Sequence, residues 1–340
     1  MNRMKLGEIL SVKHGWAFKG EYFAEDGEQS ILTPGNFFEK GGFKPNNGKE
    51  RYYTGTYPKE YLCHKGDLIV AMTQQAEGLL GSTALVPENN KYLHNQRIGL
   101  ITCDEKRLNK LFAYYLFMTK SVREQLERSS SGTKVKHTSP EKIYDVEVEI
   151  PDVISQQKIA NLLWAIDEKI ANNNAINDNL EQQMHLIFEN MMAKAATHKL
   201  SGEYTIAQNL ATVVTGKEDA NFSVPNGKYK FFTCSNTPLS CDEYVFDSSS
   251  ILIAGNGDFN VKHYSGKFNA YQRTYVLTPD KKYFGLLYLA SLYRINSFKS
   301  RSSGSFVKFI TKSDVENIPV FIPNDRFYLQ ELNKLIYLQE

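Results

Sequence analysis

The sequence contains the same domain twice, and this duplication limits the folds that it can adopt. A pattern of hydroxyl residues, glycine, a Val-Lys pair and a closing Ile-Pro occupies residues 130–151 and returns at 302–323, at a constant offset of 172 residues. An earlier shared segment, 68–71 and 251–254, lies at an offset of 183, so the copies differ in loop length. A period this long indicates a duplicated domain, because solenoid repeats are about 20–50 residues long. Two copies of one fold imply two copies of one task.

The segment between the two copies predicts one long helix. Its hydrophobic side chains recur alternately four and three residues apart, which keeps one side of a helix, here called the seam, facing a partner. Asp152 or Ser155 can cap the start of this helix, and Ser201-Gly202 closes its end. At ~1.5 Å per residue, about 40 residues would form a rod about 60 Å long. The seam positions are Ile159, Leu163, Ile166, Ile170, Asn173, Asn177, Leu180, Met184, Ile187 and Met191.

The seam needs a partner, because eight large apolar side chains on one exposed helix would associate in water. A matching segment at 329–338 follows the second copy but stops at Glu340. We therefore expect most of the seam to contact another chain or another copy of this one. The two seam asparagines, Asn173 and Asn177, either fix the register of such a pairing or mark a weak point in it.

Each copy has the pattern of a mostly β domain with inserted helix. Short β-branched and aromatic runs bounded by turn residues predict strands at 68–72, 98–102, 251–254 and 274–278. Longer segments with helical spacing lie at 108–126 and 283–298. We expect an α+β fold in which two similar domains, each a curled β-sheet plus helices, are joined by the long helix. The expected parts are residues 1–150, 151–200, 201–322 and 323–340, the last being the start of a truncated second helix.

Composition fits two globular domains in a reducing environment. The 340 residues are 41% hydrophobic and 23% charged, which is ordinary for folded domains. The four cysteines form no Cys-x-x-Cys pair and the seven histidines show no ligand spacing, so we expect no metal. The sequence has no signal-peptide pattern and no apolar stretch of membrane-spanning length, which predicts a cytoplasmic protein. The net charge of +2 is too small to indicate a polyanion partner by itself.

No sequence motif supports catalysis by this chain. A phosphate-binding loop, a His-Glu-x-x-His metal motif and a Gly-x-Ser-x-Gly elbow are all missing. Two triplets, Asp104-Glu105-Lys106 and Asp167-Glu168-Lys169, fit the short acid-and-lysine pattern of nucleases, but such triplets are common in charged sequences. One alternative function is therefore a free-standing magnesium-dependent nuclease that uses Asp104 or Asp167. A β-rich adaptor that binds proteins is another.

Polar loops provide candidate nucleic-acid contacts in both copies. The segments 129–137 and 299–308 repeat hydroxyls, a glycine and cations, which are the usual ligands of phosphate. The segments 73–77 and 255–260 follow the shared strand and differ between copies, and their amide and acidic side chains match base edges. The shared Gln-Arg pairs at 96–97 and 272–273 are assigned to the fold or to the DNA backbone. The candidate DNA-binding residues are Gln74, Gln75, Lys134, Lys136, His137, Asn256, Asp258, Asn260, Lys299, Arg301 and Lys308.

The central segment closely resembles the conserved region of specificity (S) subunits of restriction-modification systems. The resemblance rests on Ile150-Pro151, on the run 156–160, on Ile166-Asp167-Glu168-Lys169-Ile170 and on the Asn-rich stretch 173–182. The opening segment 5–9 and the run 66–70 look like parts of a target recognition domain of that family, although these motifs are looser.

The resemblance implies a non-catalytic subunit that reads a bipartite sequence in double-stranded DNA. Residues 1–150 and 201–322 would each recognise one half-site, and methyltransferase (M) subunits would dock along the helical segment. The chain itself would bind no cofactor, and S-adenosylmethionine would be carried by the methyltransferase. A motor-nuclease (R) subunit and self-association through the seam are further candidate interactions. The short final helix is compatible with three alternatives: a truncated Type I subunit, a shorter Type IIB-like subunit, or a helix pair that another chain completes.

Overall fold

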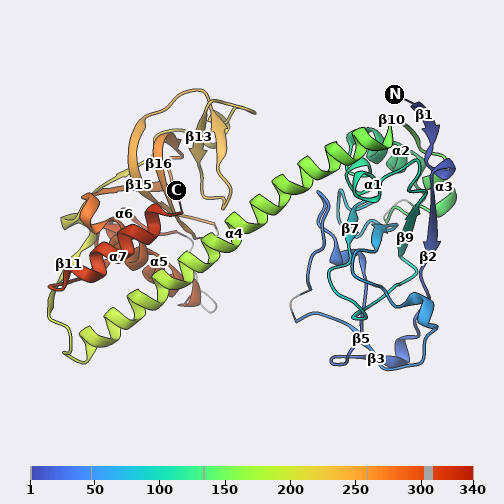
Figure 1. Ribbon diagram of the computed structural model, residues 1–340. Helices are drawn as coiled ribbons and strands as arrows, with labels where there is room; N and C mark the ends of the chain where they lie inside the picture. The colour runs from blue at the N-terminus through green and yellow to red at the C-terminus, as the bar shows by residue number, and fades with distance from the viewer. Residues whose placement is uncertain (1, 47, 133–134, 258, 302–308, 340) are drawn as a thin grey trace. The chain divides into compact units, whose positions relative to one another are not determined.

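The chain forms two compact units, which are described separately. They comprise Met1–Lys169 and Ile170–Glu340. The computed structural model describes residues 2–46, 48–132, 135–257, 259–301 and 309–339 (Figure 1). The mixed helix and strand content of both units confirms the predicted α+β class.

One helix is shared by both units. Helix α4 (Val153–Ala196) is drawn in green in Figure 1 and runs without interruption for 44 residues. The carboxylate of Asp152 accepts hydrogen bonds from the Ser155 amide and hydroxyl, at 3.0 and 2.7 Å, and so caps the helix start. The predicted long helix is confirmed, with Asp152 as its cap.

Within its described residues, the first unit contains two four-stranded sheets and one two-stranded pair. The strand orders are β2-β9-β6-β7, β3-β5-β4-β8 and β1-β10. The segment expected to be helical at 108–126 is split at Phe117–Thr119, where the Thr119 side chain caps a second helix. The strands are β1 (Asn2–Lys5), β2 (Leu10–His14), β3 (Phe23–Ala24), β4 (Ser30–Ile31), β5 (Tyr52–Tyr53), β6 (Leu68–Ala71), β7 (Thr83–Leu85), β8 (Tyr92–Leu93), β9 (Ile98–Cys103) and β10 (Glu147–Ile150). The helices are α1 (Lys110–Leu116), α2 (Lys120–Ser129) and α3 (Pro140–Tyr144).

In the described part of the second unit, one six-stranded sheet replaces the two smaller sheets. Its strand order is β12-β17-β15-β16-β13-β14, and β11 and β18 form a separate pair. The strands are β11 (Gly202–Ile206), β12 (Ala211–Thr215), β13 (Tyr229–Phe232), β14 (Leu239–Cys241), β15 (Phe246–Ala254), β16 (Val261–Ala270), β17 (Thr274–Pro279) and β18 (Pro319–Pro323). The helices are α5 (Phe284–Arg301), α6 (Lys312–Glu316) and α7 (Arg326–Tyr337).

The duplication is visible in the strand pairings. The first strand of each unit pairs antiparallel with its last, β1 with β10 and β11 with β18. The second strand then pairs with the strand that precedes the helices, β2 with β9 and β12 with β17. A third strand, β6 or β15, adds to the other side of β9 or β17. Both copies therefore share one backbone plan despite their different loops.

The second part of α4 is packed inside its own unit. Leu180, Met184 and Met191 are buried in a core that also contains residues of α5 and α7. The Tyr328 hydroxyl accepts a hydrogen bond from Lys194 at 3.2 Å, and Gln339 donates to the Asn177 carbonyl at 3.1 Å, so α7 runs antiparallel to α4. Our expectation that most of the seam requires another chain is therefore wrong for this part, because the short C-terminal helix covers it.

The first part of α4 leaves apolar side chains in solvent. Ile159, Leu162 and Ile166 are 43%, 64% and 48% exposed in the first unit, while Ala160 and Gln156 of the same helix are fully buried. In the second unit, Ile170 and the half-buried Asn177 precede the covered region. Across the part of the chain that the structure describes, no helix combines the length and apolar character needed to span a bilayer.

Gln156 joins α4 to the first unit. Its side-chain oxygen accepts a hydrogen bond from the Asn109 amide at 2.9 Å, and its nitrogen donates to the carbonyls of Arg107 and Pro151 at 3.0 and 2.9 Å. Asn333 of α7 has the same role in the second unit, where it binds the Gly285 amide and the Lys282 carbonyl at 2.8 and 2.9 Å. In each copy, a side-chain amide of the later helix, α4 or α7, is therefore hydrogen-bonded to the backbone around the start of an earlier helix, α1 or α5.

We predict that Gln156→Leu lowers the free energy of unfolding of the first unit by about 2–4 kcal/mol, because it leaves buried backbone groups without partners. Urea unfolding of the full chain, followed by circular dichroism, measures this change. Gln157→Leu is the matched control, since Gln157 is exposed on the next position of the same helix. Equal midpoints for the two variants would contradict the proposed role of Gln156.

Candidate DNA-recognition surfaces

In the first unit, the two polar segments predicted to contact DNA are hydrogen-bonded to each other. The Gln74 amide donates to the Lys136 carbonyl at 2.9 Å, and the Thr138 amide donates to the Met72 carbonyl at 2.9 Å. The Thr73 hydroxyl lies 3.1 Å from Nδ1 of His137. The structure thus brings the candidates Gln74, Lys136 and His137 together at the end of β6, while Lys134 lies outside the described residues.

The second unit repeats this pairing. The Ile310 amide donates to the Gly255 carbonyl at 2.8 Å, and Asn256 forms a β-bridge with Phe309. The Asn260 side chain donates to the Cys234 carbonyl at 2.9 Å, which holds that candidate in the loop between β15 and β16. The remaining candidates of this unit are not placed: Asp258 and Lys308 lie outside the described residues, and Lys299 and Arg301 lie on the last turn of α5 with side chains outside them.

Lys136 is already paired within the chain. Its ammonium forms an ion pair with the Glu127 carboxylate on α2, and this contact lowers the pKa of Glu127. Both side chains are partly exposed, so the pair contributes little to stability. A phosphate bound at Lys136 would therefore compete with Glu127 for the same charge.

Arg123, one turn before Glu127, anchors the loop that follows β6 through hydrogen bonds. Its guanidinium donates to the carbonyls of Gly78 and Leu80 in the loop after β6, and to the Glu39 carbonyl at 3.0 Å. Burial lowers the pKa of Arg123 to about 10. No acidic side chain pairs with it among the described residues, so backbone carbonyl dipoles balance its charge. The sequence did not point to this residue, because its partners are backbone atoms of distant loops.

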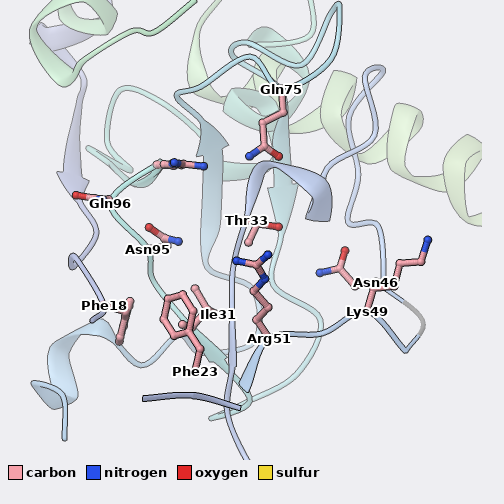
Figure 2. Close-up of a pocket in the computed structure, with 11 residues that line it drawn as sticks. Phe18, Phe23, Ile31, Thr33, Asn46, Lys49, Arg51, Gln75, Asn95 and Gln96 are labelled. Carbon is pink, nitrogen blue, oxygen red and sulfur yellow. The ribbon is translucent and has the colours of Figure 1, made fainter. Parts of the chain in front are cut away.

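A pocket of about 490 Å³ opens beside the same loop (Figure 2). It contains the candidate Gln75 together with Gln96 and Arg97, which we assigned to the fold or to the DNA backbone and which are exposed on this surface. Lys49 and Arg51, which also line the pocket, were not among the predicted residues, although their basic, turn-rich segment was a usable signal. The lining residues are Phe18, Phe23, Ile31, Thr33, Asn46, Lys49, Arg51, Gln75, Asn95, Gln96 and Arg97.

Comparison with a family model identifies the protein family of this two-unit chain. The model of the Type I restriction modification DNA specificity domain matches residues 1–182 and 210–331. The chain belongs to this family.

Individual relatives of this specificity-domain chain agree with that assignment. It is 41% identical over 115 residues to the Type I restriction enzyme EcoDI specificity subunit of Escherichia coli. It is 21% identical over 168 residues to the MjaVIII specificity subunit of Methanocaldococcus jannaschii. These matches cover 34% and 49% of this chain, but only 26% and 39% of the two relatives. The chain therefore spans between about a quarter and two-fifths of the length of these proteins.

A solved structure shares the fold of this specificity-domain chain. The S subunit of a Type-I restriction-modification system from M. genitalium superposes with a TM-score of 0.68 at 17% sequence identity. The match covers 99% of this chain and 88% of that chain. At this identity the likeness establishes the fold alone.

The acidic triplets of this family member do not build a metal site in the described part of the chain. No group of three potential ligands among its His, Cys, Asp and Glu side chains occurs there. The Asp167 carboxylate instead accepts a hydrogen bond from the Tyr115 hydroxyl at 2.7 Å, and an Asp104 oxygen accepts one from the Lys106 amide at 3.1 Å. Both acids therefore have local structural partners.

His94 supports the turn that carries Asn95, Gln96 and Arg97 into the pocket. Its Nε2 donates to the Ile98 carbonyl at 2.8 Å, and its own carbonyl accepts from the Trp16 amide at 2.8 Å. Burial lowers the pKa of His94 from 6.5 to about 4, so the ring is neutral at pH 7 and keeps the turn closed.

This shift predicts that stability falls as the pH is lowered from 6.5 to 4. The unfolded chain takes up the His94 proton at a higher pH than the folded chain, so protonation favours unfolding, by about 3 kcal/mol once the pH is below 4. Urea unfolding between pH 7 and 4.5 should show a weaker pH dependence in His94→Gln than in the unaltered chain. His64→Gln, at an exposed position, should retain the full dependence. Identical pH profiles for both variants would refute this role of His94.

Proposed function

We propose that this chain is a non-catalytic specificity subunit of a Type I restriction-modification system that reads a split sequence in double-stranded DNA. The observation that supports this proposal is a backbone pairing that recurs in both units, between the polar segment after β6 or β15 and the residues at the end of the shared hydroxyl-rich motif, Lys136 and Thr138 in one unit, or just after it, Phe309 and Ile310 in the other. Hydroxyls and cations that both copies share suit phosphate, whereas polar side chains that differ between the copies suit different base sequences. Each unit would therefore read one half-site in the same orientation relative to its own backbone.

The exposed start of α4 is the proposed docking surface for a DNA methyltransferase subunit. Ile159, Leu162 and Ile166 lie on one side of α4 and are 43%, 64% and 48% exposed, which gives the helix an apolar surface. The proposed docking surface does not include the seam residues Leu180, Met184 and Met191, because they are buried in the core of the second unit. S-adenosylmethionine would be bound by the methyltransferase and not by this chain. A motor-nuclease subunit would complete the restriction complex.

Methylation mapping tests the proposed function directly. The chain is co-expressed with its methyltransferase, and methylated positions are mapped across the host genome. We expect a motif of two short half-sites separated by unspecified bases. Exchange of residues 1–150 for the corresponding domain of a relative should change one half-site and leave the other intact. A continuous motif, or one unaffected by the exchange, would contradict the proposal. DNA cleavage by the purified chain with magnesium alone would favour the nuclease alternative.

Docking on α4 predicts that Ile159→Asp combined with Ile166→Asp weakens the methyltransferase complex at least 100-fold, because charges buried in an interface cost several kcal/mol. Sedimentation or size-exclusion chromatography of the two proteins measures this loss. The chain itself should fold normally, since both side chains are nearly half exposed in it.

The matched control places the same charges on the opposite side of the helix. Gln157→Asp with Asn161→Asp changes exposed positions about half a helical turn away from Ile159. These variants should retain the complex. If both pairs of substitutions leave it intact, the methyltransferase docks elsewhere; if the isoleucine variants instead abolish self-association, the surface joins two copies of this chain.

A further inference from the structure

We propose that the pocket in the first unit is a guanine-reading site and that Arg51 is its specificity-determining residue. This inference rests on the proposed function and assigns a ligand to one of its two recognition surfaces. It concerns residues on a loop that neither the duplicated motifs nor the family resemblance singled out.

The pocket carries an unbalanced positive charge. Three of its eleven lining residues, Lys49, Arg51 and Arg97, are cationic, and none is acidic. Among the described residues, no acidic side chain pairs with any of these three. Elsewhere in the same unit, surface lysines do have carboxylate partners, such as Lys91 with Glu88 at 2.7 Å. Three cations without an acidic partner among the described residues therefore line one pocket, which favours a ligand that supplies hydrogen-bond acceptors.

Arg51 occupies the centre of this concavity on a fixed backbone. Figure 2 shows its guanidinium next to Thr33, with Asn95 to the left, Asn46 to the right and Gln75 above. The Arg51 carbonyl accepts a hydrogen bond from the Ile31 amide at 2.7 Å, immediately before β5. Because its backbone is held by a sheet, the side chain can be presented in a defined direction.

An apolar wall borders the polar groups. Phe18 and Phe23 both line the pocket and both pack on Tyr53, with ring centroids 4.9 and 6.2 Å away. A base bound against this wall would shield the exposed guanidinium from water, which strengthens the hydrogen bonds that it can make. The wall therefore increases the discrimination available to Arg51.

The hydrogen-bond donors of Arg51 match guanine better than any of the other three bases. In the major groove guanine shows two acceptors, N7 and O6, whereas adenine shows an acceptor and a donor, cytosine a donor, and thymine an acceptor and a methyl group. The forked guanidinium matches the two guanine acceptors, and no lining carboxylate is present to accept from cytosine. Lys49 lies on the side of the pocket away from Asn95 in Figure 2, where a point charge suits a phosphate.

The test combines a protein change with a DNA change. The methylated motif identifies the half-site of the first unit, and each guanine there is replaced in turn by 7-deazaguanine, which lacks the N7 acceptor. Binding of the complex with its methyltransferase is then measured by fluorescence anisotropy. We expect one such replacement to weaken binding by the unaltered complex about 10-fold, and to have no effect on Arg51→Gln.

Arg51→Gln should lose about 10- to 100-fold in affinity for the specific site and much less for random DNA. Arg51→Lys keeps the charge but not the fork, so it should show a similar loss of discrimination. Lys49→Gln is the control, because loss of a phosphate contact weakens specific and random DNA alike and reduces the salt dependence by about one ion. The exposed position of Arg51 allows all variants to fold, which unfolding midpoints verify.

The failure of this inference differs from the failure of the proposed function. If the complex methylates a split motif but Arg51→Gln reads the same motif with unchanged affinity, the guanine assignment is overturned alone. The same conclusion follows if no guanine of that half-site couples to Arg51. If the unaltered complex shows no sequence preference at all, both proposals fall.

Discussion

The pairing of the first strand with the last strand in each unit is the constraint on which the remaining structure depends. β1 with β10, and β11 with β18, bring the two ends of each domain together in register. The following helix starts within a few residues of this pair, at Val153 or at Arg326. A side-chain amide near the start of α4, Gln156, or within α7, Asn333, then hydrogen-bonds that helix to the preceding helical region of its domain. Loops between the paired ends can vary in length without altering where the chain continues.

The two parts of α4 show how one periodic sequence serves two purposes. Leu180, Met184 and Met191 are covered by α5 and α7 and belong to a domain core. Ile159 and Ile166 have the same spacing and hydrophobicity but remain in solvent. Burial of a large apolar side chain contributes about 1.5–3 kcal/mol, so the exposed part retains a strong tendency to associate. The short final helix therefore covers one part of the seam, whereas the other part stays exposed.

The sequence predicted the elements of the fold better than their contacts. The repeat, the long helix, its Asp152 cap and the shared strands depend on local pattern, and the structure contains all of them. Burial of Met184 could not be predicted, because it depends on how a helix 140 residues later packs. The same reason explains why the sequence suggested Gln75 as a candidate but not Arg51: distant loops form the pocket that both residues line, and sequence spacing carries no information about their convergence.

One glycine in each unit, Gly15 or Gly216, packs directly against the turn that carries the shared Gln-Arg pair. A Cβ at Gly15 or Gly216 would lie 2.1 Å from the carbonyl oxygen of Asn95 or Ala270, so neither position can accept a side chain without backbone movement. The main chain of both turns is thus sterically locked, while the residue before the Gln-Arg pair differs, Asn95 in one unit and Tyr271 in the other. Because the backbone of each turn is held by this close approach, the side chain at that one position can be exchanged without rearranging the surrounding fold.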